Sequence, residues 1–333
     1  MAKKPQRTQA AAVTDPILRD GTDNDIVIPI MGPTGAGKST LLNLFLGPDR
    51  KSEHVETSAR LVSCTTVLQP VTFDIPESHA HLRKNGKGRI VIVDTPGFDD
   101  TFVDDVDILK RIADWLAKSY RNSMKLGGVI YVHDISLDRF TGTARRNLIM
   151  FQQICGEAAF PKVLLLTSKW SNFQTNKTHV AASREKEMID LQWNEMIAHG
   201  AGTFSLNPPR GVNEREESEF AWKAVENILD RVSEQREKQR NTERERARAN
   251  AAESFQIQRE LVDKHRVLPQ THAGKELRGS LKEVMERAKH DPETMAKLPP
   301  EMQTRLEAEL KEFKTPLSTK LKQIFGVYRN EDT

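Results

Sequence analysis

Cysteine is scarce in this chain, and so are long apolar runs, aromatic side chains and an excess of charge of either sign. Two cysteines, Cys64 and Cys155, cannot build a disulfide framework, which favours a reducing compartment. No apolar run reaches the ~18 residues that a membrane span requires, and no secretory signal opens the sequence. The net charge of +3, from 50 basic and 47 acidic residues, does not indicate nucleic-acid binding. We therefore expect a cytoplasmic protein with no nucleic-acid partner and no transmembrane span; peripheral membrane contact stays open.

What the chain does contain, from residue 25 to about 232, is an alternation of β-branched runs and amphipathic segments. The pattern predicts strands at 26–31, 67–75, 89–94, 127–135 and 162–168, and helices at 38–47, 103–120, 144–156, 178–199 and 220–232. The Asn-Gly pair in NGKG (85–88) predicts a tight turn that makes 67–75 and 89–94 antiparallel. The fold class is therefore α/β, in three layers, with a mostly parallel sheet plus one antiparallel hairpin strand.

The two ends of the chain differ from this middle. Residues 1–24 are basic, polar and free of aromatic side chains, which predicts a disordered tail, with a mitochondrial presequence as the alternative. Residues 233–333 predict a charged α-helical extension. Its first part suggests a coiled coil but has no apolar seam, which favours a solvated helix. Apolar stripes further on pack on each other or on the first domain, or else bind a membrane or a partner.

The segment GPTGAGKST (32–40) lies between the first predicted strand and the first predicted helix. It matches the phosphate-binding pattern G-x-x-x-x-G-K-[ST]. Glycines let several backbone N–H groups converge on one anion, and the helix adds the positive end of its dipole. Lys38 is predicted to reach the β- and γ-phosphates, and Ser39 to bind Mg²⁺. The candidate nucleotide contacts here are Gly32, Pro33, Thr34, Gly35, Ala36, Gly37, Lys38, Ser39 and Thr40.

A second motif, DTPG (94–97), ends the predicted strand 89–94. Asp94 at this place is predicted to hold Mg²⁺ through water, and the Gly97 amide to contact the γ-phosphate. An ordinary turn is the alternative, but it is less favoured behind a phosphate loop.

The polar segment 51–67 lies between these two motifs. In nucleotide switches such a segment supplies a threonine that completes the Mg²⁺ shell. Thr65 and Thr66 are the candidates, and we choose Thr65 as the third metal ligand and, with Lys38, as a catalytic candidate. Strand entry without a ligand role is the alternative for both threonines.

The third motif, TSKW (167–170), ends the predicted strand 162–168. With the phosphate loop, S-C-T (63–65) and DTPGFDD (94–100), it resembles the translation-factor-like P-loop GTPases, whose base-reading motif is [NT]-K-x-D or T-x-K-D. The resemblance is stronger to the septin and avirulence-induced (immunity-associated) GTPase group. It is strongest to uncharacterised G-domain proteins of fungal genomes, through segments 131–156 and 260–277, and it covers about residues 25–290.

This resemblance implies a G domain over 25–232 that binds GTP and GDP with Mg²⁺ as cofactor. It carries base contacts over to Thr167, Lys169 and Trp170. Trp170 stands where the T-x-K-D form has aspartate, so the carboxylate that reads guanine is missing, and the indole is left to stack on the base.

Three functions follow from these motifs. The first is a Mg²⁺-dependent GTPase switch with slow intrinsic hydrolysis, activated by a homodimer through the G domain or by a protein regulator. The second is a P-loop NTPase that prefers ATP or is non-selective, and the third is a nucleotide-locked scaffold without turnover. Phe98 follows the DxxG glycine, where Ras-like enzymes have the glutamine that orients water, which predicts a low rate of hydrolysis.

Overall fold

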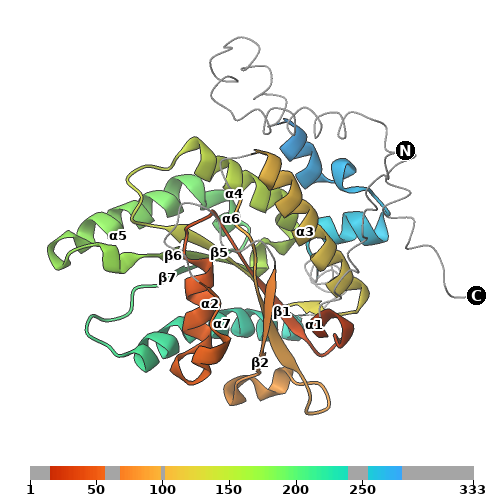
Figure 1. Ribbon diagram of the computed structural model, residues 1–333, viewed down its shortest axis with the longest axis horizontal. Coiled ribbons are helices and arrows are strands. Elements are labelled where there is room, and N and C mark those ends of the chain that lie inside the picture. The colour runs from red at the N-terminus through yellow and green to blue at the C-terminus, as the bar shows by residue number, and fades with distance from the viewer. Residues whose placement is uncertain (1–15, 57–67, 99–101, 239–253, 280–333) are drawn as a thin grey trace, which may run out of the picture.

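The computed structural model describes residues 16–56, 68–98, 102–238 and 254–279. Its centre is one sheet with helices on both faces (Figure 1). The strands follow the order β2-β3-β1-β5-β6-β7, and the short β4 pairs with β1. All neighbours are parallel except β2 and β3. The predicted three-layer fold with one antiparallel pair is therefore confirmed.

The strands that form this sheet lie close to the predicted ranges. They are β1 (Ile26–Met31), β2 (Gln69–Asp74), β3 (Arg89–Asp94), β4 (Lys125–Leu126), β5 (Val129–Asp134), β6 (Val163–Ser168) and β7 (Gly202–Ser205). The central strands β1, β5 and β6 are buried at every position, as expected for parallel strands covered on both faces. The short β4 and β7 were not predicted, because two to four residues carry too little pattern.

Two sets of helices cover the two faces of the sheet. On one face lie α2 (Lys38–Leu46) and α7 (Glu214–Lys238), which pack on each other and on the β1 side chains Ile28 and Ile30. On the other face lie α3 (Phe102–Arg121) and α4 (Gly142–Cys155). Short helices between these elements are α1 (Pro16–Arg19), η1 (Pro48–Glu53), η2 (Glu77–Leu82), η3 (Glu157–Lys162), η4 (Trp170–Asn172) and η5 (Thr175–Lys177).

The predicted single helix 178–199 is interrupted. It consists of α5 (Thr178–Glu187), a π turn η6 (Met188–Gln192) and α6 (Asn194–Ala198). The N–H of Trp193 donates to the carbonyl of Met188 at 2.8 Å, five residues back. The extra residue in this turn rotates the chain, so that Trp193 and Met196 are both completely buried. Burial of two large side chains thus overrides the uninterrupted helical pattern.

The segment 254–279 lies against α3 and α4 (Figure 1, in blue). It contains α9 (Gln256–Gln258), a π turn η7 (Arg259–Asp263), η8 (Leu268–Gln270) and helical residues 272–279. Its buried side chains share the core of α3 and α4; they are Phe255, Ile257, Leu268, Ala273 and Leu277. The carboxylate of Glu260 accepts hydrogen bonds from Arg266 Nη1 at 2.7 Å and from the backbone N–H of His272 at 2.9 Å.

This packing bears on the domain boundary expected at residue 232. Helix α7 continues past that point to Lys238, and part of the extension contributes to the core of the first domain. The division at 232 stays a prediction; the rest of the extension, 239–253 and 280–333, lies outside the described residues. Among the residues that the structure describes, no helix is both long and apolar enough to cross a membrane.

Candidate nucleotide-binding site

The phosphate loop connects the end of β1 to the start of α2, as the sequence predicted. Gly37 caps α2 with φ 93°, a left-handed conformation that favours glycine. Gly32 has φ 141°, and a Cβ there would lie 2.3 Å from the carbonyl oxygen of Val132 on the neighbouring strand. Backbone geometry therefore requires glycine at both positions, and the loop wraps over the N-terminus of α2, where N–H groups attract anions.

The second motif meets the loop at Gly97. A Cβ on Gly97 would lie 2.4 Å from the backbone nitrogen of Thr34 and 2.7 Å from Lys38 Nζ. Lys38 is buried, and its Nζ donates to the carbonyl oxygens of Gly32 at 3.0 Å and of Pro33 at 2.8 Å. The ammonium is thus held at the junction of the two motifs, where phosphate oxygens can compete for its protons.

Ser39 and Asp94 form the second link between the motifs, 55 residues apart in sequence. Ser39 Oγ donates to Asp94 Oδ2 at 2.6 Å. Asp94 Oδ1 is buried and has no hydrogen-bond partner among the described residues, and the same holds for Thr34 Oγ1. Burial raises the pKa of the Asp94 carboxyl above its ordinary value, although the hydrogen bond from Ser39 and the charge of Lys38 oppose the shift.

These oxygen donors fit a magnesium ion, which prefers carboxylate, hydroxyl and water ligands alongside phosphate oxygens. The buried, unpaired Asp94 Oδ1 is the observation that favours such a role. No cluster of three or more His, Cys, Asp or Glu side chains suited to a metal occurs within 16–56, 68–98, 102–238 and 254–279. A magnesium ion here would therefore depend on nucleotide oxygens to complete its shell.

The threonine predicted to complete this shell, Thr65, lies outside the described residues, as do Thr66 and Cys64. The structure does show how the segment leading to them begins. Asn43 on α2 donates from Nδ2 to the carbonyl of Val55 at 2.9 Å and accepts from the Val55 N–H at 2.8 Å. This pair of bonds fixes residue 55 on the outer face of the phosphate-loop helix.

The end of β6 is joined to the phosphate loop by Ser168, a residue that the sequence analysis did not select. Its hydroxyl donates to the carbonyl oxygens of Ala36 at 2.7 Å and His133 at 3.2 Å. Lys169 follows in a left-handed conformation, φ 59°, and its Nζ lies 2.7 Å from Asp134 Oδ2. Asp134 thus positions the lysine predicted to lie along the base; a polar residue ending β5 was the available signal.

Trp170 faces the core. Its side chain is 7% exposed and packs with Ile135, Ala181 and Phe173, and Nε1 donates to Thr167 Oγ1 at 3.0 Å. Stacking on a base, as predicted from the sequence, would require the ring to leave this packing. The next residue, Ser171, is exposed, and the N-K-x-D form of the motif, counted from Lys169, places Ser171 where aspartate stands. Thr167, a predicted base contact, is completely buried.

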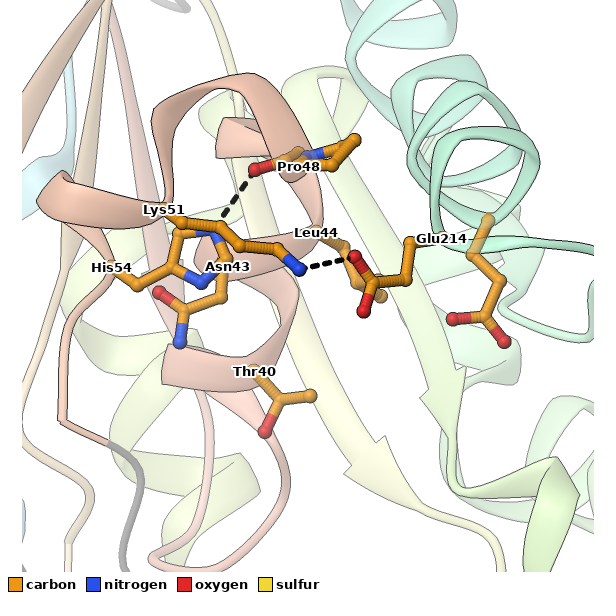
Figure 2. A pocket seen from close by; sticks show the side chains of 9 residues that line it. Thr40, Asn43, Leu44, Pro48, Lys51, His54 and Glu214 are labelled. Carbon is orange, nitrogen blue, oxygen red and sulfur yellow. Dashed lines mark hydrogen bonds and ion pairs between the residues drawn. The ribbon is translucent and has the colours of Figure 1, made fainter.

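Thr40, the last residue of the predicted loop contacts, points into a groove beside α2 (Figure 2). The groove has a volume of about 420 Å³ and lies between α2, η1 and the first turn of α7. Lys51 and Glu214 pair across it at 2.6 Å, and His54 Nε2 donates to the Gly47 carbonyl at 2.9 Å. Lys51 and Glu214 thus neutralise each other, and Glu217 also lines the groove.

Phe98, which follows the DTPG motif, and His133 in β5 are both buried. Phe98 packs in the core that contains α3, so it cannot bond a water molecule. His133 packs edge-on against Trp193, with ring centroids 6.0 Å apart, and lies 5.9 Å from Phe140. Burial lowers the pKa of His133 to about 4, although the charge of Asp134 opposes the shift. His133 is therefore neutral at pH 7 and structural in role.

Comparison with known families gives one match: residues 27–167 fit the family described as 50S ribosome-binding GTPase. The match takes less than half of the chain. No curated protein matches.

Several solved structures are similar. Toc33 from Arabidopsis thaliana, as a dimerization-deficient mutant, is 17% identical with a TM-score of 0.46, covering 64% of this chain and 86% of that chain. Toc33 in complex with Mg²⁺ and GMPPNP is 17% identical with a TM-score of 0.45, covering 66% and 88%. Era from Aquifex aeolicus bound to GDP·AlF4⁻ is 16% identical with a TM-score of 0.40, covering 62% and 56%. These scores are too low for details of those sites to be transferred. Residues 27–167 thus match a GTPase family model, and the chain has the fold of a P-loop G domain followed by a helical C-terminal part.

Proposed function

We propose that this protein is a Mg²⁺-dependent guanine-nucleotide switch with slow intrinsic hydrolysis. The observation that carries the proposal is the junction of the two phosphate motifs, where Gly97 abuts Thr34 and Lys38 Nζ without room for a Cβ. A switch needs the second motif within reach of the terminal phosphate, so that its backbone responds to the presence of that phosphate. An ordinary glycine-rich turn has no need of this contact.

The proposed roles follow from the chemistry of each group. Lys38 binds the β- and γ-phosphates, the backbone N–H groups of residues 32–37 surround the phosphates, and the Gly97 amide contacts the γ-phosphate. Ser39 and Asp94, with Thr65, hold the magnesium ion. Bound Mg²⁺ neutralises charge on the phosphate oxygens.

Hydrolysis is proposed to be slow in the isolated protein. The side chain of Phe98 has no hydrogen-bond donor or acceptor that could orient a water molecule, and it is buried in the core. A Ras-like enzyme that has the glutamine turns over alone at only about 10⁻⁴–10⁻³ s⁻¹, which we take as the upper order here. We infer that a second copy or a regulator completes the site. Phosphate release per protein should then rise with protein concentration or with added partner; fast turnover independent of dilution would contradict this inference.

Guanine rather than adenine is the proposed base, on the family match to a GTPase. The competing function, a non-selective NTPase, is favoured by the absence of a carboxylate at 170 or 171.

We also propose that the protein belongs to the septin and avirulence-induced GTPase group and that it is located in the cytoplasm. The first rests on the motifs GPTGAGKST, S-C-T, DTPGFDD and T-x-K, the second on composition alone.

The test is titration of fluorescent GTP and ATP analogues with and without Mg²⁺. Lys38→Ala removes the ammonium at the motif junction, so we expect triphosphate affinity to fall about 100-fold or more. Lys51→Ala is the matched control, because Lys51 forms a surface pair with Glu214 away from the loop. Unchanged binding in Lys38→Ala would overturn the site assignment, and equal affinity for both analogues would favour the non-selective NTPase.

A further inference from the structure

Four side chains at the ends of β6 and β7 form one hydrogen-bonded chain, the Glu185 network: Thr167, Trp170, Glu185 and Ser205. Glu185 Oε1 accepts from Thr167 Oγ1 and from Ser205 Oγ, each at 2.6 Å. Thr167 Oγ1 in turn accepts from Trp170 Nε1 at 3.0 Å. The two bonds to Glu185 have the length typical of a hydroxyl donating to an ionised carboxylate.

Glu185 sets the direction of every proton in this network. A threonine hydroxyl has one proton, and the carboxylate takes it, which leaves the oxygen lone pairs for the indole N–H of Trp170. Ser205 is held by the same oxygen atom, so one carboxylate ties the end of β6 to the end of β7. The backbone repeats this link, since the Leu206 N–H donates to the Thr167 carbonyl at 2.8 Å.

The end of β6 leads into the turn that carries Lys169, the candidate base contact, and the end of β7 pairs with the end of β6. Lys169 and Ser171 follow β6, and residues 206–211 follow β7. Trp170 lies between Lys169 and Ser171, so the network that holds its ring also holds the turn that carries them. The opposite side of this turn is anchored by Ser168 to the phosphate loop.

We propose that Glu185 is a positioning residue for base recognition: by orienting Thr167 and Ser205 it fixes the turn that carries Lys169 and Ser171 against the end of β7. It touches the base at no point, and it acts through Trp170 and the strand ends. This inference rests on the proposed nucleotide function. The chain has no carboxylate at 170 or 171, where the motif has aspartate. In this inference the carboxylate of Glu185, on α5, orders the end of β6 instead.

Nucleotide affinity with and without a base is the first test. GTP contacts both the phosphate loop and the base edge, whereas inorganic tripolyphosphate contacts the loop alone. We expect Glu185→Ala to raise the Kd for GTP about tenfold and to leave that for tripolyphosphate unchanged. Glu185→Gln keeps an oxygen that accepts both hydroxyls and should restore most of the affinity. Glu187→Ala, an exposed glutamate of the same helix, is the matched control and should behave as wild type.

Hydrogen–deuterium exchange of the nucleotide-free protein is the second test. In Glu185→Ala, peptides covering 167–173 and 202–206 should exchange faster, and peptides of the phosphate loop should not. If Glu185→Ala only lowers the melting temperature and leaves the ratio of the Kd for GTP to the Kd for tripolyphosphate unchanged, the inference is overturned and the proposed function remains intact. A wild type that binds tripolyphosphate as tightly as GTP also overturns it. A wild type that binds neither ligand refutes the proposed function, and the exchange pattern then decides whether Glu185 orders the two strand ends.

Discussion

Trp170→Asp places a carboxylate where a buried indole now packs with Ile135, Ala181 and Phe173. If the indole lay on the nucleotide, this substitution would restore two hydrogen bonds to guanine and shift binding towards GTP. In the structure the ring faces the core and its N–H is bonded to Thr167. We therefore expect Trp170→Asp to lose stability and not to gain guanine preference.

The magnitude follows from burial. Removing a large buried aromatic side chain costs about 3–5 kcal/mol, and a carboxylate in the same place adds the cost of desolvating a charge or of protonating it. The whole stability of a domain is about 5–15 kcal/mol, so this variant should be largely unfolded or poorly soluble. Trp170→Phe keeps a ring and loses one hydrogen bond, so it should cost about 1 kcal/mol. Ser171→Asp, at an exposed position, should change stability by about 0.5 kcal/mol or less.

The assay is thermal and urea unfolding followed by circular dichroism, without nucleotide, for all three variants. Competition titrations with GTP and ATP follow for those that fold. We expect Ser171→Asp to move the preference towards GTP, because its carboxylate lies on the exposed side of the turn. A Trp170→Asp protein that is as stable as wild type and binds GTP selectively would refute the inward placement of the indole.

Further predictions concern other parts of the site and the segment 254–279. His133 has a pKa of about 4 when folded against 6.5 ordinarily, so between these values only the unfolded chain binds its proton. Stability should therefore fall by at most about 3 kcal/mol as the pH drops from 6.5 to 4, and His133→Phe should remove this part of the slope in urea titrations. Gly97→Ala should weaken triphosphate binding at least about tenfold, since its Cβ would displace the Thr34 amide. Gly35→Ala, at a backbone φ of 76°, should lose about 1 kcal/mol of stability. Glu260→Ala should lower stability by about 3 kcal/mol, measured by calorimetry, because Arg266 loses a buried partner; an unchanged melting temperature would show that 254–279 does not stabilise the core.

The sequence alone was sufficient for the local elements of the phosphate site. A β-branched run, a glycine-rich turn and a helix at 26–47 predict a strand, a loop and a helix, because backbone preferences and apolar spacing act over a few residues. The same holds for the position of the DTPG motif at the end of β3 and for the antiparallel pair of β2 and β3. Their match to the structure is the reason why the fold class could be predicted.

Only the tertiary structure decided which residues meet. The sequence predicted that Ser39 and Asp94 share a magnesium ion, but the direct hydrogen bond between them, across 55 residues, is seen only in the structure. Residues 254–279, separated from the G domain by a charged segment, bury Phe255 and Ile257 against α3 and α4, although the pattern placed them in an extension. The same is true of Trp170, whose direction was set by Thr167 and Glu185. The local sequence pattern shows that a side chain is apolar. Whether that side chain points into the core or towards solvent depends on residues that the sheet brings together, and those residues are distant in sequence.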